Sequence, residues 1–183
     1  MTKEIIAFQG EKGAYSHLAC EETFPQAIIR TCATFEETFK MASEDENVKI
    51  MVPIENSLAG RVADIHYLLT KYKLQIYSEH FQNVEHNLLV KEGTELKDIK
   101  YVRSHAQAID QCQKIISKNK FKTIISADTA GSAKDLSSSN DKSIAAIASK
   151  LSAKIYNLKI LKSNIEDDAG NVTRFLIMGK KVN

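Results

Sequence analysis

The stretch that decides the fold is IKYVRSHAQAIDQCQKIISKNKFKTIISA, residues 99–127. It opens with a β-branched run at 99–102 and closes with another at 123–127. The intervening residues predict a helix over 106–118, and two strands joined through a helix run parallel. The pattern continues with helices predicted over 128–137 and 150–157 and a strand over 143–148. This alternation predicts an α/β fold.

Working outward, short β-branched runs predict further strands at 4–8, 28–33, 49–54, 74–77, 84–90 and 173–178. Helical spacing of apolar residues separates most of them, and Thr34 with Glu37 predicts a capping box. We therefore expect mostly parallel sheets. Residues 74–90 contain no helix pattern, which indicates a crossing between two lobes. The predicted lobes are 1–78 plus 170–183, and 79–169.

Composition excludes several classes of protein. Of 183 residues, 43% are apolar, and 25 Lys and Arg against 23 Asp and Glu leave a charge of +2, so nucleic acid is not an expected partner. Cys20, Cys32 and Cys112 lack metal or disulfide spacing, and we expect them to be buried. The sequence shows neither a secretion signal nor an apolar run long enough for a bilayer. We expect a cytoplasmic protein without membrane contact.

Polar, turn-forming residues follow the carboxyl ends of several predicted strands. They are Gly10 to Ser16, Glu55 to Ser57, Ser104 to Gln107, Asp128 with Thr129, and Ser149. Ligands bind at such ends in open parallel sheets, so the pattern favours a site for a small anion. The same residue types also serve as plain helix N-caps, and both interpretations stay open.

Other chemistry is not indicated. The sequence has no G-x-x-x-x-G-K-S/T loop and no complete dinucleotide fingerprint, which argues against a nucleotide cofactor. It has no H-E-x-x-H and its histidines are scattered, so no metal is expected. No G-x-S-x-G elbow is present, so covalent catalysis is not predicted.

Four stretches together resemble the signature sequences of the prephenate dehydratase family, in the same order. They are VPIENSLAGRV at 52–62, SHAQAIDQC at 104–112, DTAGSAK at 128–134 and NVTRF at 171–175. The resemblance implies a two-lobed domain similar to a type II periplasmic binding protein, with the site in the interlobe cleft. It also implies a reaction, the loss of carbon dioxide and water from prephenate to give phenylpyruvate, that needs no cofactor.

The resemblance further assigns roles to individual residues. It makes Thr173, Asn56 and Gln111 catalytic, with the Thr173 hydroxyl as a positioned donor to the departing oxygen. Arg174 is expected to pair with a substrate carboxylate, and the alternative is an ion pair with Glu166, Asp167 or Asp168. The residues expected to bind substrate are Ser16, Glu55, Ser57, Ser104, Gln107, Thr129 and Arg174. If a helix already includes Ser104, then Ser104 and Gln111 share one of its faces.

The chain ends at Asn183, soon after Phe175, so we expect no ACT regulatory domain and no feedback inhibition through one. Two alternatives to prephenate dehydratase stay open. One is an arogenate dehydratase, whose substrate carries an amino group in place of the side-chain keto group. The other is a non-catalytic module that binds small anions. The resemblance also implies a homodimer.

Overall fold

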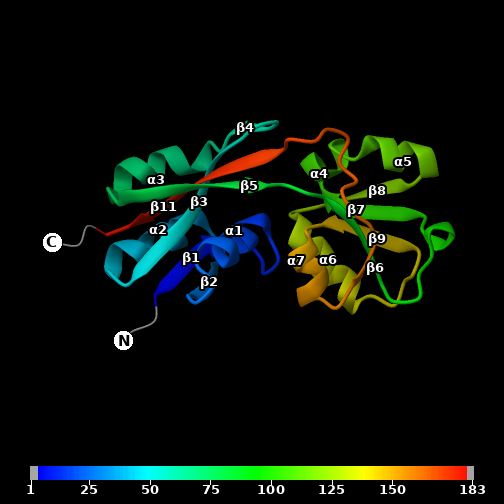
Figure 1. Ribbon diagram of the computed structural model, residues 1–183, viewed down its shortest axis with the longest axis horizontal. Coiled ribbons are helices and arrows are strands. Elements are labelled where there is room, and N and C mark those ends of the chain that lie inside the picture. Colours follow the sequence, from blue (N-terminus) through cyan, green and yellow to red (C-terminus); the bar gives the residue numbers. More distant parts are fainter. Residues whose placement is uncertain (1–3, 181–183) are drawn as a thin grey trace. The chain divides into compact units, whose positions relative to one another are not determined.

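The computed structural model describes residues 4–180, which divide into two compact units. Unit 1 contains the residues up to Glu11, Tyr15–Asn83 and the residues from Asn171 onward. Unit 2 contains Lys12–Ala14 and Val84–Gly170. In Figure 1, unit 1 holds the blue, cyan and red segments, and unit 2 holds the yellow and orange ones. Each unit has its own β-sheet with helices packed on it.

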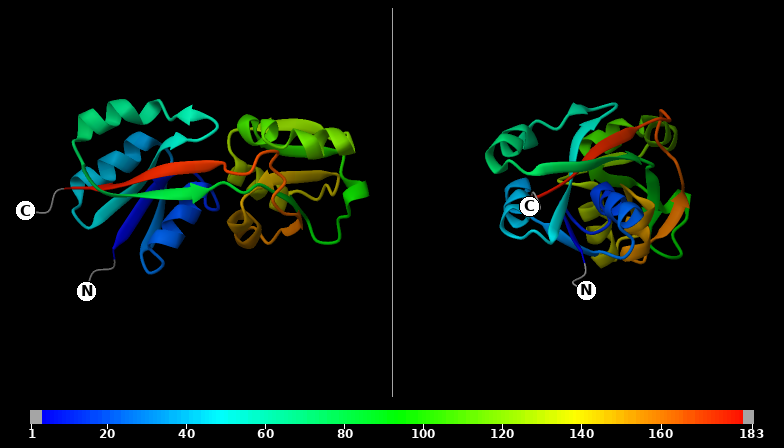
Figure 2. Two further views of the ribbon diagram at one scale, coloured as in Figure 1. Left: turned by 45° about the horizontal axis from the view of Figure 1, so that its top comes forward. Right: turned by 60° about the vertical axis from the view of Figure 1, so that its left-hand side comes forward.

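The sheet of unit 1 has six strands in the order β2-β1-β3-β11-β5, with β4 paired to β3. They are β1 (Ile5–Gln9), β2 (Ile28–Cys32), β3 (Val48–Asn56), β4 (Gly60–Arg61), β5 (Gln75–Asn83) and β11 (Val172–Gly179). β1 is parallel to both β2 and β3, whereas β11 is antiparallel to β3 and β5. Figure 2 shows β11 in red beside β5 in green. The first residues of β11 therefore lie next to the last residues of β3.

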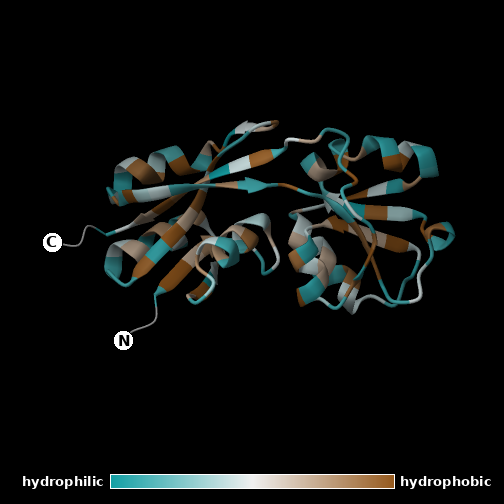
Figure 3. Ribbon diagram, in the orientation of Figure 1, coloured by the Kyte–Doolittle hydropathy of each residue, from teal (hydrophilic) through white to brown (hydrophobic). Residues whose placement is uncertain are grey.

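Three helices cover this sheet: α1 (Tyr15–Thr23), α2 (Phe35–Glu44) and α3 (Asp64–Tyr72). Phe39 of α2 and Ile65 of α3 are completely buried in one core with Ile50 of β3. The bands of hydrophobic colour along α2 and α3 in Figure 3 fit helices that bury one face.

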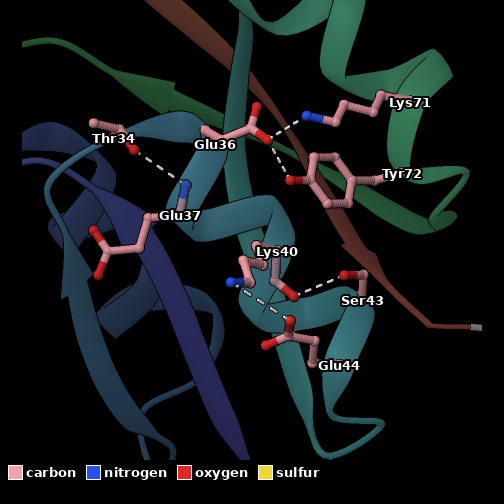
Figure 4. A network of polar contacts seen from close by, with 8 residues as sticks. All are labelled: Thr34, Glu36, Glu37, Lys40, Ser43, Glu44, Lys71 and Tyr72. Carbon is pink, nitrogen blue, oxygen red and sulfur yellow. Dashed lines mark hydrogen bonds and ion pairs between the residues drawn. The ribbon is translucent and has the colours of Figure 1, made fainter.

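Polar contacts fix the start of α2 and join it to α3 (Figure 4). Thr34 Oγ accepts from the Glu37 N–H at 3.1 Å, so Thr34 is the N-cap, but the predicted capping box is incomplete because the Glu37 carboxylate accepts from the Ala33 N–H at 2.8 Å rather than from the Thr34 N–H. Glu36 accepts from Lys71 Nζ at 2.6 Å and from the Tyr72 hydroxyl. This second contact group is exposed and adds little to stability compared with the buried core.

The sheet of unit 2 has five strands in the order β10-β6-β9-β7-β8. They are β6 (Asn87–Val90), β7 (Tyr101–His105), β8 (Lys122–Ser126), β9 (Ile144–Ala148) and β10 (Lys159–Lys162). Its helices are the 3-10 helix η1 (Leu96–Asp98), α4 (Ala106–Asp110), α5 (Gln113–Asn119), α6 (Thr129–Ser138) and α7 (Lys150–Ile155). The predicted parallel unit of residues 99–127 is present, because β7 pairs in parallel with β8.

The α/β class is confirmed, but the sheets are mixed rather than mostly parallel. Four strand pairings are parallel and five are antiparallel. A crossover helix makes strands parallel, and every antiparallel pairing here includes β4, β6 or β11, each of which follows the preceding strand with no α-helix between them. β4 and β10 were not predicted, because they are short and carry few apolar residues.

The division into units also differs from the predicted lobes. β5 continues to Asn83 because it pairs with β11 as far as Val172, so unit 1 ends at Asn83 rather than at 78. Residues Lys12–Ala14 pack with unit 2, where the Gly13 carbonyl accepts from the Ser149 and Ser152 hydroxyls at 2.6 and 2.9 Å. No helix within residues 4–180 is long and apolar enough to cross a membrane.

Candidate active site

In unit 1, Asn56 and Thr173 meet at one end of the sheet. Asn56 is the last residue of β3, and Thr173 is its register partner near the start of β11. Antiparallel pairing places the end of one strand beside the start of the other, so residues 117 positions apart come into hydrogen-bond contact. The sequence assigned both residues to the site by resemblance, and the register shows how the fold unites them.

The amide of Asn56 has a defined orientation. Its Oδ1 accepts from the Leu58 and Ala59 N–H groups at 3.1 and 2.9 Å, which closes the loop after β3. Its Nδ2 donates to Asn171 Oδ1 at 2.7 Å and to Thr173 Oγ at 3.0 Å. Because the backbone donors identify the oxygen, the amide can only donate toward Thr173.

This orientation determines what the Thr173 hydroxyl can do. A hydroxyl carries one hydrogen, and its oxygen here already accepts from Asn56. The hydroxyl hydrogen is therefore directed away from Asn56 and is available as a donor. The half-buried Thr173 is thus suited to donate to an oxygen of a bound molecule.

Sequence reasoning did not single out Asn171, which is only 3% exposed. Its side-chain oxygen accepts the second N–H of the Asn56 amide, so it helps to hold that amide in place. Asn171 begins the NVTRF stretch, and this position was the available signal. The contact itself depends on strand register, which local sequence does not reveal.

Ser57 and Glu55 flank Asn56. The Ser57 N–H donates to the Val172 carbonyl, and Ser57 Oγ accepts from the Val172 N–H, both at 2.9 Å. Ser57 thus extends the pairing of β3 with β11 by one residue. Glu55 is exposed and lies opposite Arg174 in the register.

Arg174 forms an ion pair, but not with the carboxylates expected from the sequence. Its Nε and Nη2 lie 2.8 and 2.7 Å from Glu79 Oε2 on the neighbouring strand β5, and its guanidinium lies over the Phe81 ring. The expected partners 166–168 belong to unit 2, whereas cross-strand pairing brings Glu79 next to Arg174.

In unit 2, Gln111 lies at a break between two helices. The predicted helix over 106–118 is in fact two helices, α4 and α5. Gln111 is the C-cap of α4, and Cys112 is the N-cap of α5. Asp167, from a distant part of the chain, contacts both sides of this break. Its N–H donates to the Gln111 carbonyl at 2.7 Å, and its carboxylate accepts from the Lys114 N–H at 3.0 Å.

The Gln111 side chain contacts a buried histidine. Its Oε1 lies 2.8 Å from His86 Nε2, and His86 is 2% exposed. Burial lowers the pKa of His86 below its ordinary value, while the bond to Gln111 and the Glu166 charge act in the opposite direction. His86 was not among the predicted site residues.

The other predicted binding residues lie on several elements of the two units. Ser104 is in β7, not in a helix, so it does not share a helix face with Gln111, and its buried hydroxyl donates to the Ile147 carbonyl at 2.6 Å. Thr129 begins α6, where Asp128 is the N-cap and accepts from the Gly131 N–H at 2.6 Å. Gln107 in α4 and Ser16 in α1 are half-buried. Asp128 and Ser149 are helix N-caps, as expected if these polar residues cap helices rather than bind a ligand.

The fold is a two-unit α/β domain, and in unit 1 the Asn56 amide and the Thr173 hydroxyl form a candidate site. A family model described as prephenate dehydratase matches residues 6–183. The chain belongs to the prephenate dehydratase family.

Several named proteins and solved structures are similar to this chain. A bifunctional N-acyl-homoserine lactone acylase/prephenate dehydratase of Komagataeibacter europaeus is 41% identical over 179 residues, with 98% of this chain and 64% of the relative covered. Arogenate dehydratase/prephenate dehydratase 1, chloroplastic, of Arabidopsis thaliana is 41% identical over 180 residues, with 98% and 46% covered. The solved structure of the prephenate dehydratase from Staphylococcus aureus matches with a TM-score of 0.84 at 28% identity, covering 97% of this chain and 67% of that chain. The chain thus spans about half to two thirds of the length of these relatives.

Proposed function

We propose that this domain converts prephenate into phenylpyruvate, carbon dioxide and water, as a step toward phenylalanine. Membership of the prephenate dehydratase family supports the reaction class. The single observation that carries the proposal is the hydrogen bond from Asn56 to Thr173, because it turns the Thr173 hydroxyl into a donor.

The reaction needs such a donor. The bond between the ring and its carboxylate breaks, and its electron pair enters the ring while the C–O bond to the ring hydroxyl breaks. The carboxylate leaves as carbon dioxide, and the hydroxyl leaves as hydroxide that takes up one proton to become water. Hydroxide is a poor leaving group, so a donor that reaches the oxygen as the bond breaks accelerates the step by roughly 10² to 10⁴-fold.

Thr173 acts as a hydrogen-bond donor and not as the ultimate source of the proton. A proton lost from its hydroxyl would have to be replaced before the next turnover, so the proton that completes the product water comes in the end from solvent. A fixed donor stabilises negative charge without having to reorient during the reaction. The bonds that Asn56 makes to Asn171 and to the loop after β3 provide this fixed orientation.

Gln111 is the second proposed catalytic donor, through its amide. We assign the substrate carboxylates to Arg174 and to the N–H groups and hydroxyl at the start of α6, represented by Thr129. For Arg174, this role requires that the exposed pair with Glu79 exchange for a substrate carboxylate. The remaining proposed binding residues are Ser16, Glu55, Ser57, Ser104 and Gln107.

Arogenate is the other candidate substrate, since the Arabidopsis relative is named for both reactions. The test is to incubate the purified chain with each substrate and to follow phenylpyruvate by its alkaline absorbance and phenylalanine by chromatography. Turnover of prephenate supports the proposal, and a preference for arogenate changes only the substrate. Binding of prephenate without turnover of either substrate would instead support a non-catalytic binding module.

We also propose that the protein acts in the cytoplasm as a homodimer. Cys20, Cys32 and Cys112 are buried free thiols, which fits a reducing compartment. Sedimentation equilibrium tests the dimer and cell fractionation tests the compartment.

A further inference from the structure

His86 is a buried residue that the proposed mechanism does not yet use. It precedes β6 and contacts Gln111, which lies 25 positions later in the sequence. Buried polar side chains are costly unless they are hydrogen-bonded, so the partner of such a residue indicates its purpose. Here the partner is one of the proposed catalytic residues.

The contact between the two side chains has one direction. The amide oxygen of Gln111 faces the imidazole and can only accept, so this contact corresponds to the tautomer that carries its hydrogen on Nε2. With the oxygen directed at His86, the NH₂ group of the same amide lies on the other side of Cδ. His86 thereby determines where Gln111 presents its donors.

The surrounding backbone holds both partners in place. The His86 N–H donates to Glu166 Oε2 at 2.8 Å, and the His86 carbonyl accepts from the Ile165 N–H at 2.9 Å. The next residue, Asp167, donates its N–H to the Gln111 carbonyl at 2.7 Å. Residues 165–167 therefore bind His86 on one side and Gln111 on the other, which fixes the distance between them.

The charge state of His86 suits this arrangement. Burial lowers its pKa, so the imidazole is neutral near neutral pH and has a single N–H. That one hydrogen is committed to Gln111.

We propose that His86 is a positioning residue, which orients the Gln111 amide so that its N–H groups donate to the substrate. This inference rests on the proposed function, in which Gln111 contacts the substrate. A histidine that only filled space would not need a hydrogen on Nε2, and this difference makes the role testable.

The first test is a double-mutant cycle with prephenate as substrate. The variants are His86→Leu, Gln111→Leu and the double variant, together with His86→Gln, whose amide nitrogen reaches the place of the imidazole Nε2. We expect His86→Leu to lower kcat by about tenfold or more with little change in KM, since small misplacements of a catalytic group cost this much. The double variant should be no slower than Gln111→Leu, and His86→Gln should recover most of the loss.

Ile116→Ala is the matched control, because Ile116 is buried in the core of unit 2 and has no role in the proposed mechanism. It should lower the urea midpoint and leave kcat unchanged. A kcat for His86→Leu within about threefold of wild type would overturn the positioning role. Additive losses in the double variant, or no recovery in His86→Gln, would overturn it too.

The second test does not depend on activity. Long-range ¹H–¹⁵N spectra of the wild-type chain should show His86 as the Nε2–H tautomer at pH 7.5, and Gln111→Leu should change its shifts. The opposite tautomer would overturn the proposal. If the wild-type chain turns over neither substrate, the catalytic role is overturned, and a retained Nε2–H tautomer then shows that the proposed function failed rather than the contact.

Discussion

Asn56→Asp is the substitution that probes the site most selectively. It replaces the Nδ2 donor with an oxygen of nearly the same size, while the other oxygen can still accept from Leu58 and Ala59. The new carboxylate can only accept, so the Thr173 hydroxyl must turn its hydrogen toward position 56. The variant therefore reverses one hydrogen bond and removes the donor from the substrate.

The size of the effect follows from this reversal. Losing a positioned donor to the leaving oxygen should lower kcat by roughly 10² to 10⁴-fold, or about 2.7 to 5.4 kcal/mol in activation free energy. The bond to Asn171 is lost and the bond to Thr173 is reversed, which should lower the free energy of unfolding by about 1 to 3 kcal/mol. The loss in catalysis should therefore exceed the loss in stability.

Steady-state kinetics with prephenate measures the first quantity, and urea unfolding measures the second. Asn119→Asp is the control, since it makes the same atomic change where the lost bond is to the Ile115 carbonyl in α5. It should leave kcat unchanged. A kcat for Asn56→Asp within about threefold of wild type would refute the reasoning, because the hydroxyl would then act without the orientation that Asn56 imposes.

Three further predictions concern substrate binding, backbone strain and pH. Arg174→Lys should raise KM severalfold and leave kcat nearly unchanged, because lysine cannot reproduce the two-pronged hydrogen bonding of the guanidinium group. An unchanged KM in steady-state assays would mean that Arg174 serves only its ion pair with Glu79 and does not bind substrate. Gly13→Ala should lower the free energy of unfolding by about 1 to 3 kcal/mol more than Gly170→Ala does. Both glycines have positive φ (+93° and +96°), but only at Gly13 would an added Cβ meet another residue, at 2.9 Å from the Ser152 Cα. Equal urea midpoints for the two variants would contradict this prediction. Because the pKa of His86 is lowered in the native protein, the unfolded chain takes up a proton below about pH 6.5 that the native chain does not. The free energy of unfolding should therefore fall as the pH falls, by up to about 1.4 kcal/mol per pH unit. His86→Leu should lack this contribution between pH 7.5 and 5, and identical pH profiles of unfolding would exclude it.

The parts of the fold that depend on neighbouring residues could be predicted from the sequence. The parallel unit of residues 99–127 and the cap at Thr34 are such cases, because propensity and side-chain spacing determine them locally. The antiparallel placement of β11 could not be predicted in this way. It depends on pairing with strands far away in the sequence, and a short β-branched run is compatible with either direction.

The same division applies to the site. Resemblance selected Asn56, Gln111 and Thr173, but the periodicity of residues 106–118 predicted one continuous helix. In the structure that helix is interrupted, and the N–H of Lys114 in the second helix donates to Asp167, which lies 53 positions away and which local periodicity cannot reveal. Asn171 and His86 were missed for a related reason, since their importance comes only from the side chains that they contact.

The catalytic role of the Thr173 hydroxyl is tested most directly by kcat for prephenate in Thr173→Val, with Thr173→Ser beside it. Valine keeps the shape of the side chain and removes the hydroxyl, whereas serine keeps the hydroxyl. We predict that Thr173→Val lowers kcat by roughly 10²-fold or more with KM little changed, and that Thr173→Ser retains most of the activity. A Thr173→Val enzyme with a kcat close to that of wild type would contradict the proposed mechanism.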